Sequence, residues 1–288
     1  MKKYLEIWEL GKSFTNERGT QQVVDGFNLT VEEGEFVCLI GHSGCGKSTV
    51  LSIVAGLAAP SAGTVILAGR EVTGPGTDRG VVFQAPCLFP WMTALENVTL
   101  GLEQAFPALT ATERRERGAE HLDRVGLGSA LHKHPAELSQ GMRQRVGLAR
   151  AFALEPNMLL LDEPFGMLDS LTRLELEDAL MEAWSRQRIT ALMVTHDVDE
   201  AIYLSSRVAM MTSGPGAKLG GILPVPFERP RDRTALAESP EYDRAREELI
   251  GFLENQAHPG AAVPALIEAT PEQAPDEEAV QPTAIIHA

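Results

Sequence analysis

The residues with the clearest chemistry lie in one glycine-rich loop, Gly41 to Ser48, which reads GHSGCGKS. The pattern G-x-x-x-x-G-K-S follows an apolar run from Glu35 to Ile40 and precedes the helix-like run STVLSIVAGL. In such a strand–loop–helix setting, glycines let the backbone curl so that its N–H groups cradle a chain of phosphates. The helix that starts near Lys47 adds the positive end of its dipole. We therefore expect a nucleoside triphosphate here, with Lys47 on its β- and γ-phosphates and the Ser48 hydroxyl on Mg²⁺.

Two adjacent acids, Asp162 and Glu163, follow the apolar run MLLL that begins at Met158. In P-loop NTPases an Asp at the end of such a strand holds Mg²⁺. A second carboxylate beside it can polarise the attacking water as a general base. Helix capping would account for one of the acids, but it explains poorly why both follow MLLL. The sequence therefore predicts that Asp162 is a Mg²⁺ ligand and that Glu163 is the catalytic base.

Gln84 and His196 also follow apolar runs, GVVF and ITALMVT. Taken alone, each residue would be read as an ordinary polar residue. Ligands of parallel sheets bind at the carboxyl ends of the strands, where both residues and the loop 41–48 are expected to meet. We therefore expect Gln84 to ligate Mg²⁺ or to position water, and His196 to sense the γ-phosphate.

A second anion site is indicated by LSQGM, residues 138–142. Ser139 is a candidate helix N-cap, which leaves the N–H groups of Gln140 and Gly141 exposed at a helix start. One ATP does not need two helix N-termini from one chain. A symmetric dimer resolves this, because each ATP would lie between the loop 41–48 of one subunit and Ser139 of the other.

The elements that position these residues indicate an α/β fold. Continuous apolar runs alternate with helical sequence, which is typical of a parallel sheet covered on both faces. Residues 3–10 and 22–31 alternate apolar and polar around the stretch TNERGTQQ, which predicts an antiparallel hairpin with a turn there. Glu- and Arg-rich helical sequence between 86 and 155 indicates a helical insertion.

The last part of the chain divides in two. ESPEYDRAREELIGFLEN, with Ser239 as a cap and Pro240 at the first helical position, predicts a small amphipathic helix. The residues from 257 onward are rich in Ala, Pro and Glu, and we expect them to be disordered. The predicted divisions are 1–87 (nucleotide-binding core with a β subdomain), 88–155 (helical signature subdomain), 156–225 (second part of the core), 226–256 (C-terminal helical extension) and 257–288 (disordered acidic tail).

Composition limits the function. The 288 residues carry a net charge of −15, which argues against sequence-independent nucleic-acid binding because that binding neutralises phosphates with Lys and Arg. Cys38, Cys45 and Cys87 lack metal-ligand spacing and are expected to be free thiols in a reducing compartment. The N-terminus has no apolar core suited to a signal peptide, and no run reaches the about 18 apolar residues of a membrane span. We expect a cytosolic protein, or one attached to a membrane only through a partner.

Together these motifs resemble those of the ATP-binding subunits of ABC transporters, over roughly residues 4–255. The resemblance implies a P-loop NTPase (RecA-like) core with an antiparallel β subdomain and a helical insertion, the cofactors ATP and Mg²⁺, and ATPase activity coupled to transport. GHSGCGKST is similar to the Walker A motif, LSQGMRQRV to the signature motif, MLLLDEP to Walker B, Gln84 to the Q-loop, Met167-Leu168-Asp169 to the D-loop and Thr195-His196-Asp197 to the H-loop.

One signature position departs from the family pattern. Gln140 replaces the first glycine of Leu-Ser-Gly-Gly, but Ser139 and Gly141 remain, so we expect ATP binding across the dimer to survive. Phe14 falls where the family places an aromatic residue that stacks on adenine, with a hairpin core residue as the alternative. The implied nucleotide-binding residues are Phe14, Gly41, His42, Ser43, Gly44, Cys45, Gly46, Lys47, Ser48, Thr49, Ser139, Gln140, Gly141 and Asp169. The implied Mg²⁺ ligands are Ser48, Gln84 and Asp162, and the implied catalytic residues are Glu163, His196 and Gln84.

Within the family, stretches such as GREVTGPGTDRGVVFQ and LFPWMTALENV look like importers of nitrate, nitrite, cyanate, bicarbonate, taurine and sulfonates, with the nitrate branch favoured. The resemblance implies a homodimer on the cytoplasmic face of the inner membrane, bound to integral-membrane permease subunits and indirectly to a solute-binding protein. A permease coupling helix would contact Leu88–Met92. The apolar side chains of Leu88, Phe89, Trp91 and Met92 could equally form the seam that holds the helical insertion.

Two other functions stay open at this point. A soluble ABC ATPase acting on DNA or ribosomes would need long coiled-coil insertions or two cassettes with basic surfaces, and this chain has one cassette, no heptad run and an acidic balance. A P-loop small-molecule kinase would leave the LSQGM and THD stretches without a task. Co-purification with a polytopic membrane protein would distinguish a transport motor from both.

Overall fold

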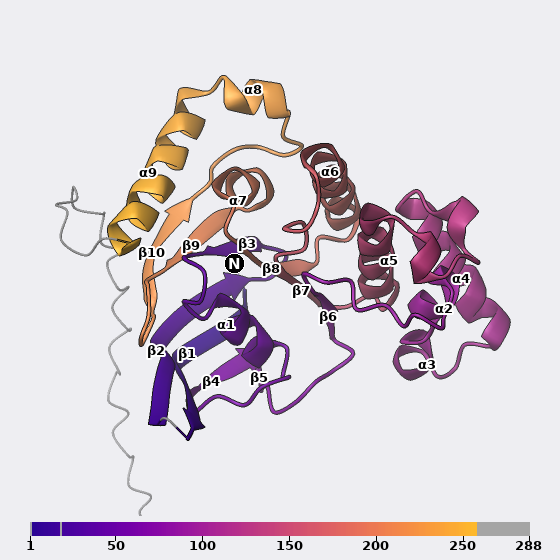
Figure 1. Cartoon of the computed structure of the whole chain (residues 1–288), viewed down its shortest axis with the longest axis horizontal. Coiled ribbons are helices and arrows are strands. Elements are labelled where there is room, and N and C mark those ends of the chain that lie inside the picture. Colours follow the sequence, from indigo (N-terminus) through magenta and orange to yellow (C-terminus); the bar gives the residue numbers. More distant parts are fainter. Residues whose placement is uncertain (1, 18, 258–288) are drawn as a thin grey trace, which may run out of the picture.

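The computed structural model describes residues 2–17 and 19–257, in which two sheets carry helices on their faces and a helical cluster at one edge (Figure 1). The main sheet has the strand order β10-β9-β3-β8-β7-β6; five of these strands are parallel, and β10 runs antiparallel to β9. The strands are β3 (Phe36–Ile40), β6 (Arg79–Val82), β7 (Met158–Asp162), β8 (Thr190–Thr195), β9 (Arg207–Met211) and β10 (Leu219–Pro224).

Both faces of the main sheet are buried, which explains its continuous apolar strands. In β3, Val37 and Leu39 pack into one apolar cluster, whereas Cys38 and Ile40 pack into the cluster on the other face. The prediction of a parallel sheet covered on both faces is confirmed. β6 ends at Val82, so Gln84 lies two residues beyond the strand rather than at its last position.

The second sheet is antiparallel, in the order β2-β1-β4-β5. Its strands are β1 (Lys3–Asn16), β2 (Gly19–Glu32), β4 (Ala62–Leu67) and β5 (Arg70–Glu71). The hairpin is confirmed, but the prediction of a turn over TNERGTQQ is wrong because the strands run through most of it. Thr15 and Thr20 pair across the two strands, and their hydroxyl oxygens are 3.0 Å apart. The end of the hairpin is exposed on both faces, so its polar residues form strand without an alternating apolar pattern.

The helices of the core cover the main sheet. On one face, α1 (Lys47–Val54) packs between the two sheets. On the other face lie α6 (Ser170–Gln187), α7 (Val198–Leu204) and α9 (Pro240–Ala257), with α8 (Arg233–Ala237) before α9 (Figure 1). The helix predicted from Pro240 is present, and Ser239 Oγ accepts a hydrogen bond from Glu241 N at 3.2 Å. Sequence analysis missed α7 and β10.

The helical cluster has an apolar core of its own, formed by residues such as Leu95, Leu122 and Val146. Side-chain caps fix the starts of three of its helices, with capping boxes at Thr93 and Thr110 and a cap at Ser139. The last helix, α5 (Gln140–Ala153), also contributes to the main core and thus joins the cluster to the sheet. The cluster comprises α2 (Ala94–Thr99), α3 (Leu102–Ala105), α4 (Ala111–Arg124), the 3-10 turns η1 (Gly128–Ala130) and η2 (Pro135–Glu137), and α5 (Gln140–Ala153).

Across residues 2–17 and 19–257, no helix combines the length and apolar character that crossing a membrane requires. The predicted disordered tail lies, from residue 258 onward, outside the described residues.

Candidate nucleotide site

The loop between β3 and α1 is curled around a lysine. Lys47 Nζ donates to the carbonyl oxygens of Gly41 at 2.7 Å and His42 at 2.9 Å, and Lys47 is buried. Gly46 precedes α1 at φ 107°, and a Cβ there would come within 2.9 Å of Val23 Cγ1, so the position requires glycine. No side chain caps α1, which leaves its first N–H groups free to bind an anion. Burial raises the pKa of the Cys45 thiol, which therefore serves here as a small apolar residue.

Ser48 and Asp162 meet at the start of this helix. Ser48 Oγ donates to Asp162 Oδ1 at 2.8 Å, although the two residues are 114 positions apart. The pKa of Asp162 lies above its ordinary value. Partial burial and the charge of Glu163 raise it, and they outweigh the lowering effects of the hydrogen bond from Ser48 and the charge of Lys47. A hydroxyl and a carboxylate oxygen side by side are hard oxygen donors of the kind that Mg²⁺ takes.

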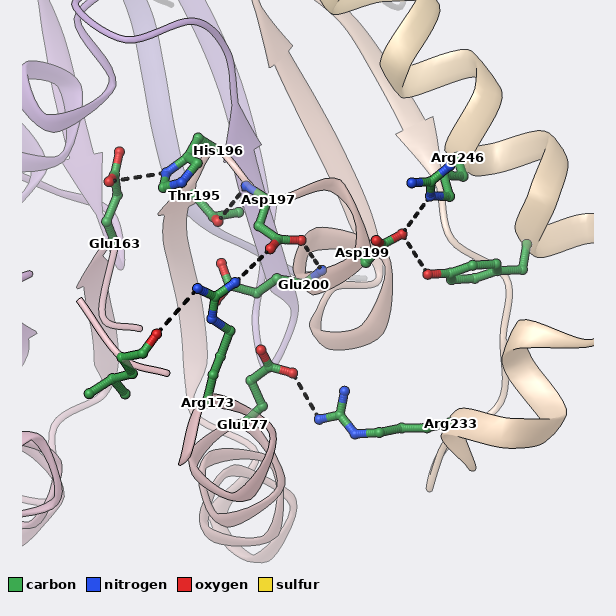
Figure 2. Close-up of polar contacts among 12 residues, drawn as sticks. Glu163, Arg173, Glu177, Thr195, His196, Asp197, Asp199, Glu200, Arg233 and Arg246 are labelled. Carbon is green, nitrogen blue, oxygen red and sulfur yellow. Dashed lines mark hydrogen bonds and ion pairs between the residues drawn. The ribbon is translucent and has the colours of Figure 1, made fainter. Parts of the chain in front are cut away.

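Two polar side chains, those of Gln84 and His196, converge on one carboxylate oxygen of Glu163. Glu163 Oε2 accepts a hydrogen bond from Gln84 Nε2 at 3.3 Å. The same oxygen lies 3.2 Å from His196 Nδ1, and Figure 2 shows this second contact. These residues follow β6, β7 and β8, which are neighbours in the sheet. Glu163 has φ 44°, a left-handed backbone that a residue with a side chain rarely adopts, and its N–H donates to Val194 O at 2.9 Å. The structure thus brings together the acid, the glutamine and the histidine that the sequence placed at strand ends.

The LSQGM stretch, residues 138–142, lies apart from the loop that precedes α1. Ser139 Oγ accepts from Met142 N at 3.2 Å and caps α5, as the sequence indicated. A Cβ on Gly141 would come within 2.5 Å of Thr172 Cγ2, so this helix start packs against the first turn of α6. Asp169 caps α6 by accepting from Thr172 N at 3.1 Å. In Figure 1, α5 lies beside the β6 edge of the main sheet, whereas α1 lies beneath its centre.

Comparison with known proteins shows which family has this arrangement. A model of the ABC transporter family matches residues 24–166. The nitrate import ATP-binding protein NrtD of Synechococcus elongatus is 48% identical over 244 residues, which cover 85% of this chain and 89% of that protein. The bicarbonate transport ATP-binding protein CmpD of the same organism is 49% identical over 253 residues, covering 88% of this chain and 91% of that protein.

This chain belongs to the ATP-binding subunits of ABC transporters. The nitrate transport protein NasD of Klebsiella oxytoca is 46% identical over 254 residues, covering 88% of this chain and 97% of that protein. A dimeric structure of the ATP-binding cassette MJ0796, bound to ADP and phosphate after hydrolysis, superposes with a TM-score of 0.70 at 31% identity and covers 78% of this chain and 100% of that one. The prediction of an ABC ATPase fold, with ATPase activity coupled to transport, is confirmed.

In this ABC subunit the unusual signature residue turns toward its own helix. Gln140 Oε1 accepts from Arg143 Nη2 at 3.0 Å, one turn along α5. Gly141 is buried and Ser139 is exposed. The Gln140 side chain is thus occupied locally and leaves the Ser139 hydroxyl at the surface.

Phe14 is 50% exposed near the end of the β1–β2 hairpin, with Lys12 Nζ 5.1 Å from its ring centroid. It is not part of the hairpin core, so that alternative is wrong. An exposed ring is free to stack on a planar ligand.

Sequence analysis missed the residues that hold the segment on either side of Gln84. Two side chains of α5 reach this segment: Gln144 Nε2 donates to Phe83 O at 3.2 Å, and Arg150 donates to Pro86 O at 2.9 Å and Cys87 O at 3.0 Å. No sequence signal singled out these two residues, because α5 also carries the polar residues Gln140, Arg143 and Arg145. Helix α5 therefore links Ser139 at its first end to the segment next to Gln84.

The loop 89–93 is held by a buried asparagine. The Asn97 side chain accepts from Phe89 N and donates to three carbonyl oxygens, including that of Met92 at 3.1 Å. Leu88 packs against the helical cluster, as expected of a seam residue. Trp91 is 69% exposed, and its ring centroid lies 5.5 Å from that of Phe89, so these two aromatics form an apolar pair at the surface.

Proposed function

We propose that this chain is the ATP-hydrolysing subunit of an importer of small planar oxyanions, nitrate or bicarbonate. The identities of 46–49% to proteins named for nitrate and for bicarbonate transport support this class and favour neither anion. The observation that carries the ATPase role is the convergence of Gln84 and His196 on Glu163, close to the Ser48–Asp162 pair.

The phosphates of ATP would lie in the loop 41–49. The N–H groups at the start of α1 and the Lys47 ammonium would bind them, with Gly41, His42, Ser43, Gly44, Cys45, Gly46, Ser48 and Thr49 forming the loop. Lys47 would exchange its carbonyl partners for phosphate oxygens. Phe14 would stack on the adenine ring.

Mg²⁺ would be held by Ser48, Gln84 and Asp162. The Ser48–Asp162 contact supports two of these ligands, whereas Gln84 bonds to Glu163 in this structure and would turn to reach the ion. Bound Mg²⁺ would neutralise charge on the phosphates.

The remaining residues would act on the attacking water. Glu163 would accept the proton of this water. His196, 3.2 Å from the Glu163 carboxylate, would contact the γ-phosphate and keep it in a fixed position relative to Glu163. General base catalysis of this kind contributes about 10²- to 10⁴-fold, and positioning and electrostatics would supply the rest.

A second copy would complete the site. Ser139, Gln140, Gly141 and Asp169 would face the ATP bound to the partner subunit. Large apolar side chains next to this region support a covered surface, since Leu171 is 75% and Met167 58% exposed. The dimeric state of the cassette MJ0796, 31% identical to this chain, supports a dimer here.

The membrane partner would be a permease at the cytoplasmic face. The exposed pair Phe89 and Trp91, on the loop fixed by Asn97, would take its coupling helix near Leu88–Met92. A solute-binding protein would deliver the anion to the permease, and nucleic acid has no part in this function.

The substitution Glu163→Gln tests the ATPase role. The variant is expected to bind Mg-ATP, to lose about 100-fold or more of its hydrolysis and to accumulate as an ATP-bound dimer. Unchanged hydrolysis would remove Glu163 from its role. Uptake of labelled nitrate and of bicarbonate by a deletion strain, with and without the gene, would then choose the anion.

A further inference from the structure

An ion pair behind the nucleotide site connects two of its loops. Arg173 lies in the first turns of α6, and Asp197 directly follows His196. Arg173 Nη1 donates to Asp197 Oδ2 at 2.9 Å (Figure 2). Its other terminal nitrogen, Nη2, donates to the carbonyl oxygen of Leu168 at 3.5 Å, in the loop that leads to Asp169. One guanidinium therefore contacts both the loop that carries His196 and the loop that carries Asp169.

The ion pair is separate from the capping of α7. Asp197 Oδ1 caps this helix by accepting from Glu200 N at 3.0 Å, and the Asp197 N–H donates to Thr195 Oγ1 at 3.0 Å. Both contacts would exist without Arg173. The second carboxylate oxygen of Asp197 is thus left to hold the loop against α6.

Two other carboxyl groups lie near Arg173, those of Glu177 and Glu200, and neither competes with Asp197 for it. Glu177, one turn along α6 and 3% exposed in its side chain, pairs with Arg233 at 2.8 Å. Glu200 is buried, and burial raises its pKa to about 8, so it is mostly neutral at pH 7. Neither carboxyl group therefore takes the place of Asp197 as the partner of Arg173.

Arg173, Asp197 and Glu200 also form a wall between two cavities. On one side is a small cavity lined by Glu163 and His196, and on the other a cavity that extends to α8 and α9. Both side chains of the ion pair are 31% exposed, so the pair is shielded in part from water. A salt bridge in this setting holds its geometry better than one on an open surface.

We propose that Arg173 is a positioning residue for ATP hydrolysis, which fixes the His196 loop and the Asp169 loop in one arrangement. This role rests on the proposed function, since it acts through His196 and Asp169. The contacts of Arg173 to Asp197 and Leu168 do not involve the loop 41–49. Loss of Arg173 should therefore affect the hydrolysis step and leave ATP binding within one subunit intact.

The experiment compares Arg173→Gln, Arg173→Lys and Asp197→Asn with the full-length wild-type chain. Asparagine is also a good N-cap, so Asp197→Asn removes the ion pair and keeps the cap. We expect kcat to fall about tenfold in Arg173→Gln and Asp197→Asn, because small misplacements of catalytic groups cost up to about 100-fold. The Kd for Mg-ATP and the KM should change less than about twofold. The double variant should be no slower than either single variant, and Arg173→Lys should regain part of kcat.

A second arginine provides the matched control. Arg246 Nε donates to Asp199 Oδ1 at 2.9 Å and thus makes an equivalent pair to α7 from α9. Arg246→Gln should keep the wild-type kcat. Full activity in Arg173→Gln, or a parallel loss of ATP binding and thermal stability, would overturn the positioning role. If the wild-type chain itself binds no ATP, the proposed function fails, and the positioning role fails with it.

Discussion

His42 Nε2 lies 2.6 Å from the carbonyl oxygen of Leu253, so the candidate phosphate-binding loop touches the C-terminal helix α9. A carbonyl oxygen only accepts, so the histidine donates. Three residues further along α9, Gln256 Oε1 accepts from Ser213 N at 3.1 Å and fixes the same helix beyond the end of β9. Helix α9 therefore supports the loop from outside the nucleotide site.

The substitution His42→Ala removes this support. We expect ATP affinity to fall about three- to tenfold and the free energy of unfolding to fall by about 1 kcal/mol, the net value of one hydrogen bond. Equilibrium ATP titration and urea unfolding measure the two effects. Gln256→Ala is the control, because it removes a hydrogen bond of α9 that does not involve the loop, and its ATP affinity should fall less than that of His42→Ala. Equal ATP affinity in His42→Ala would contradict the supporting role of α9.

The burial of Glu200 predicts a pH-dependent stability. Burial, together with the nearby carboxylates of Glu177 and Asp197, raises its pKa to about 8, against the lowering effects of a hydrogen bond with Thr195 and the charge of Arg173. The unfolded chain releases this proton near its usual pKa of 4.5. Between these values the folded state binds more protons, so this group makes the protein less stable as pH rises, and its effect levels off above about pH 8.

Glu200→Gln should remove that slope. We expect the free energies of unfolding of wild type and variant to differ little near pH 4.5. At higher pH the variant should become more stable relative to the wild type, by at most about 1.4 kcal/mol per pH unit up to pH 8. Urea unfolding at a series of pH values measures the difference. The exposed residue Glu182, which pairs with Arg186, provides the control Glu182→Gln, whose curve should run parallel to the wild type. A constant difference between Glu200→Gln and wild type across the range would contradict the assignment.

The sequence predicted the elements around the nucleotide site because their signals are local. The glycines and Lys47 define a loop whose geometry depends on neighbours within eight residues, and the apolar run before Asp162 announces a buried strand. The cap at Ser139 was equally visible, since capping is decided within one turn. These parts were confirmed in position, although Gln84 lies beyond its strand.

The contacts that support the site could not be predicted in the same way. Arg173 meets Asp197, 24 residues on, only because α6 and α7 pack on the same face of the sheet. His42 meets Leu253 across 211 residues. Such pairs depend on strand order and helix placement, which local sequence patterns do not encode. Helix α7 was missed because it is short and most of its first turn is polar, and β10 was missed because its glycines resemble a turn.

Ser139→Arg tests whether the start of α5 serves the partner subunit. The substitution is made in a Glu163→Gln background. We expect each chain to bind ATP with the affinity of its parent, because this helix start lies apart from the loop 41–49. The ATP-dependent dimer should be lost, because the substitution places a bulky side chain at the interface. Sedimentation with and without Mg-ATP measures the dimer, and nucleotide titration measures binding.

The Ser139→Arg substitution also removes an N-cap, at a cost of about 1 kcal/mol. Thr110→Arg controls for that loss, since Thr110 caps α4 in the same way, with Oγ1 accepting from Glu113 N at 3.3 Å. Thr110→Arg should be destabilised to a similar extent and still dimerise; an ATP-bound dimer of the Ser139→Arg chain would show that α5 does not face the partner's nucleotide.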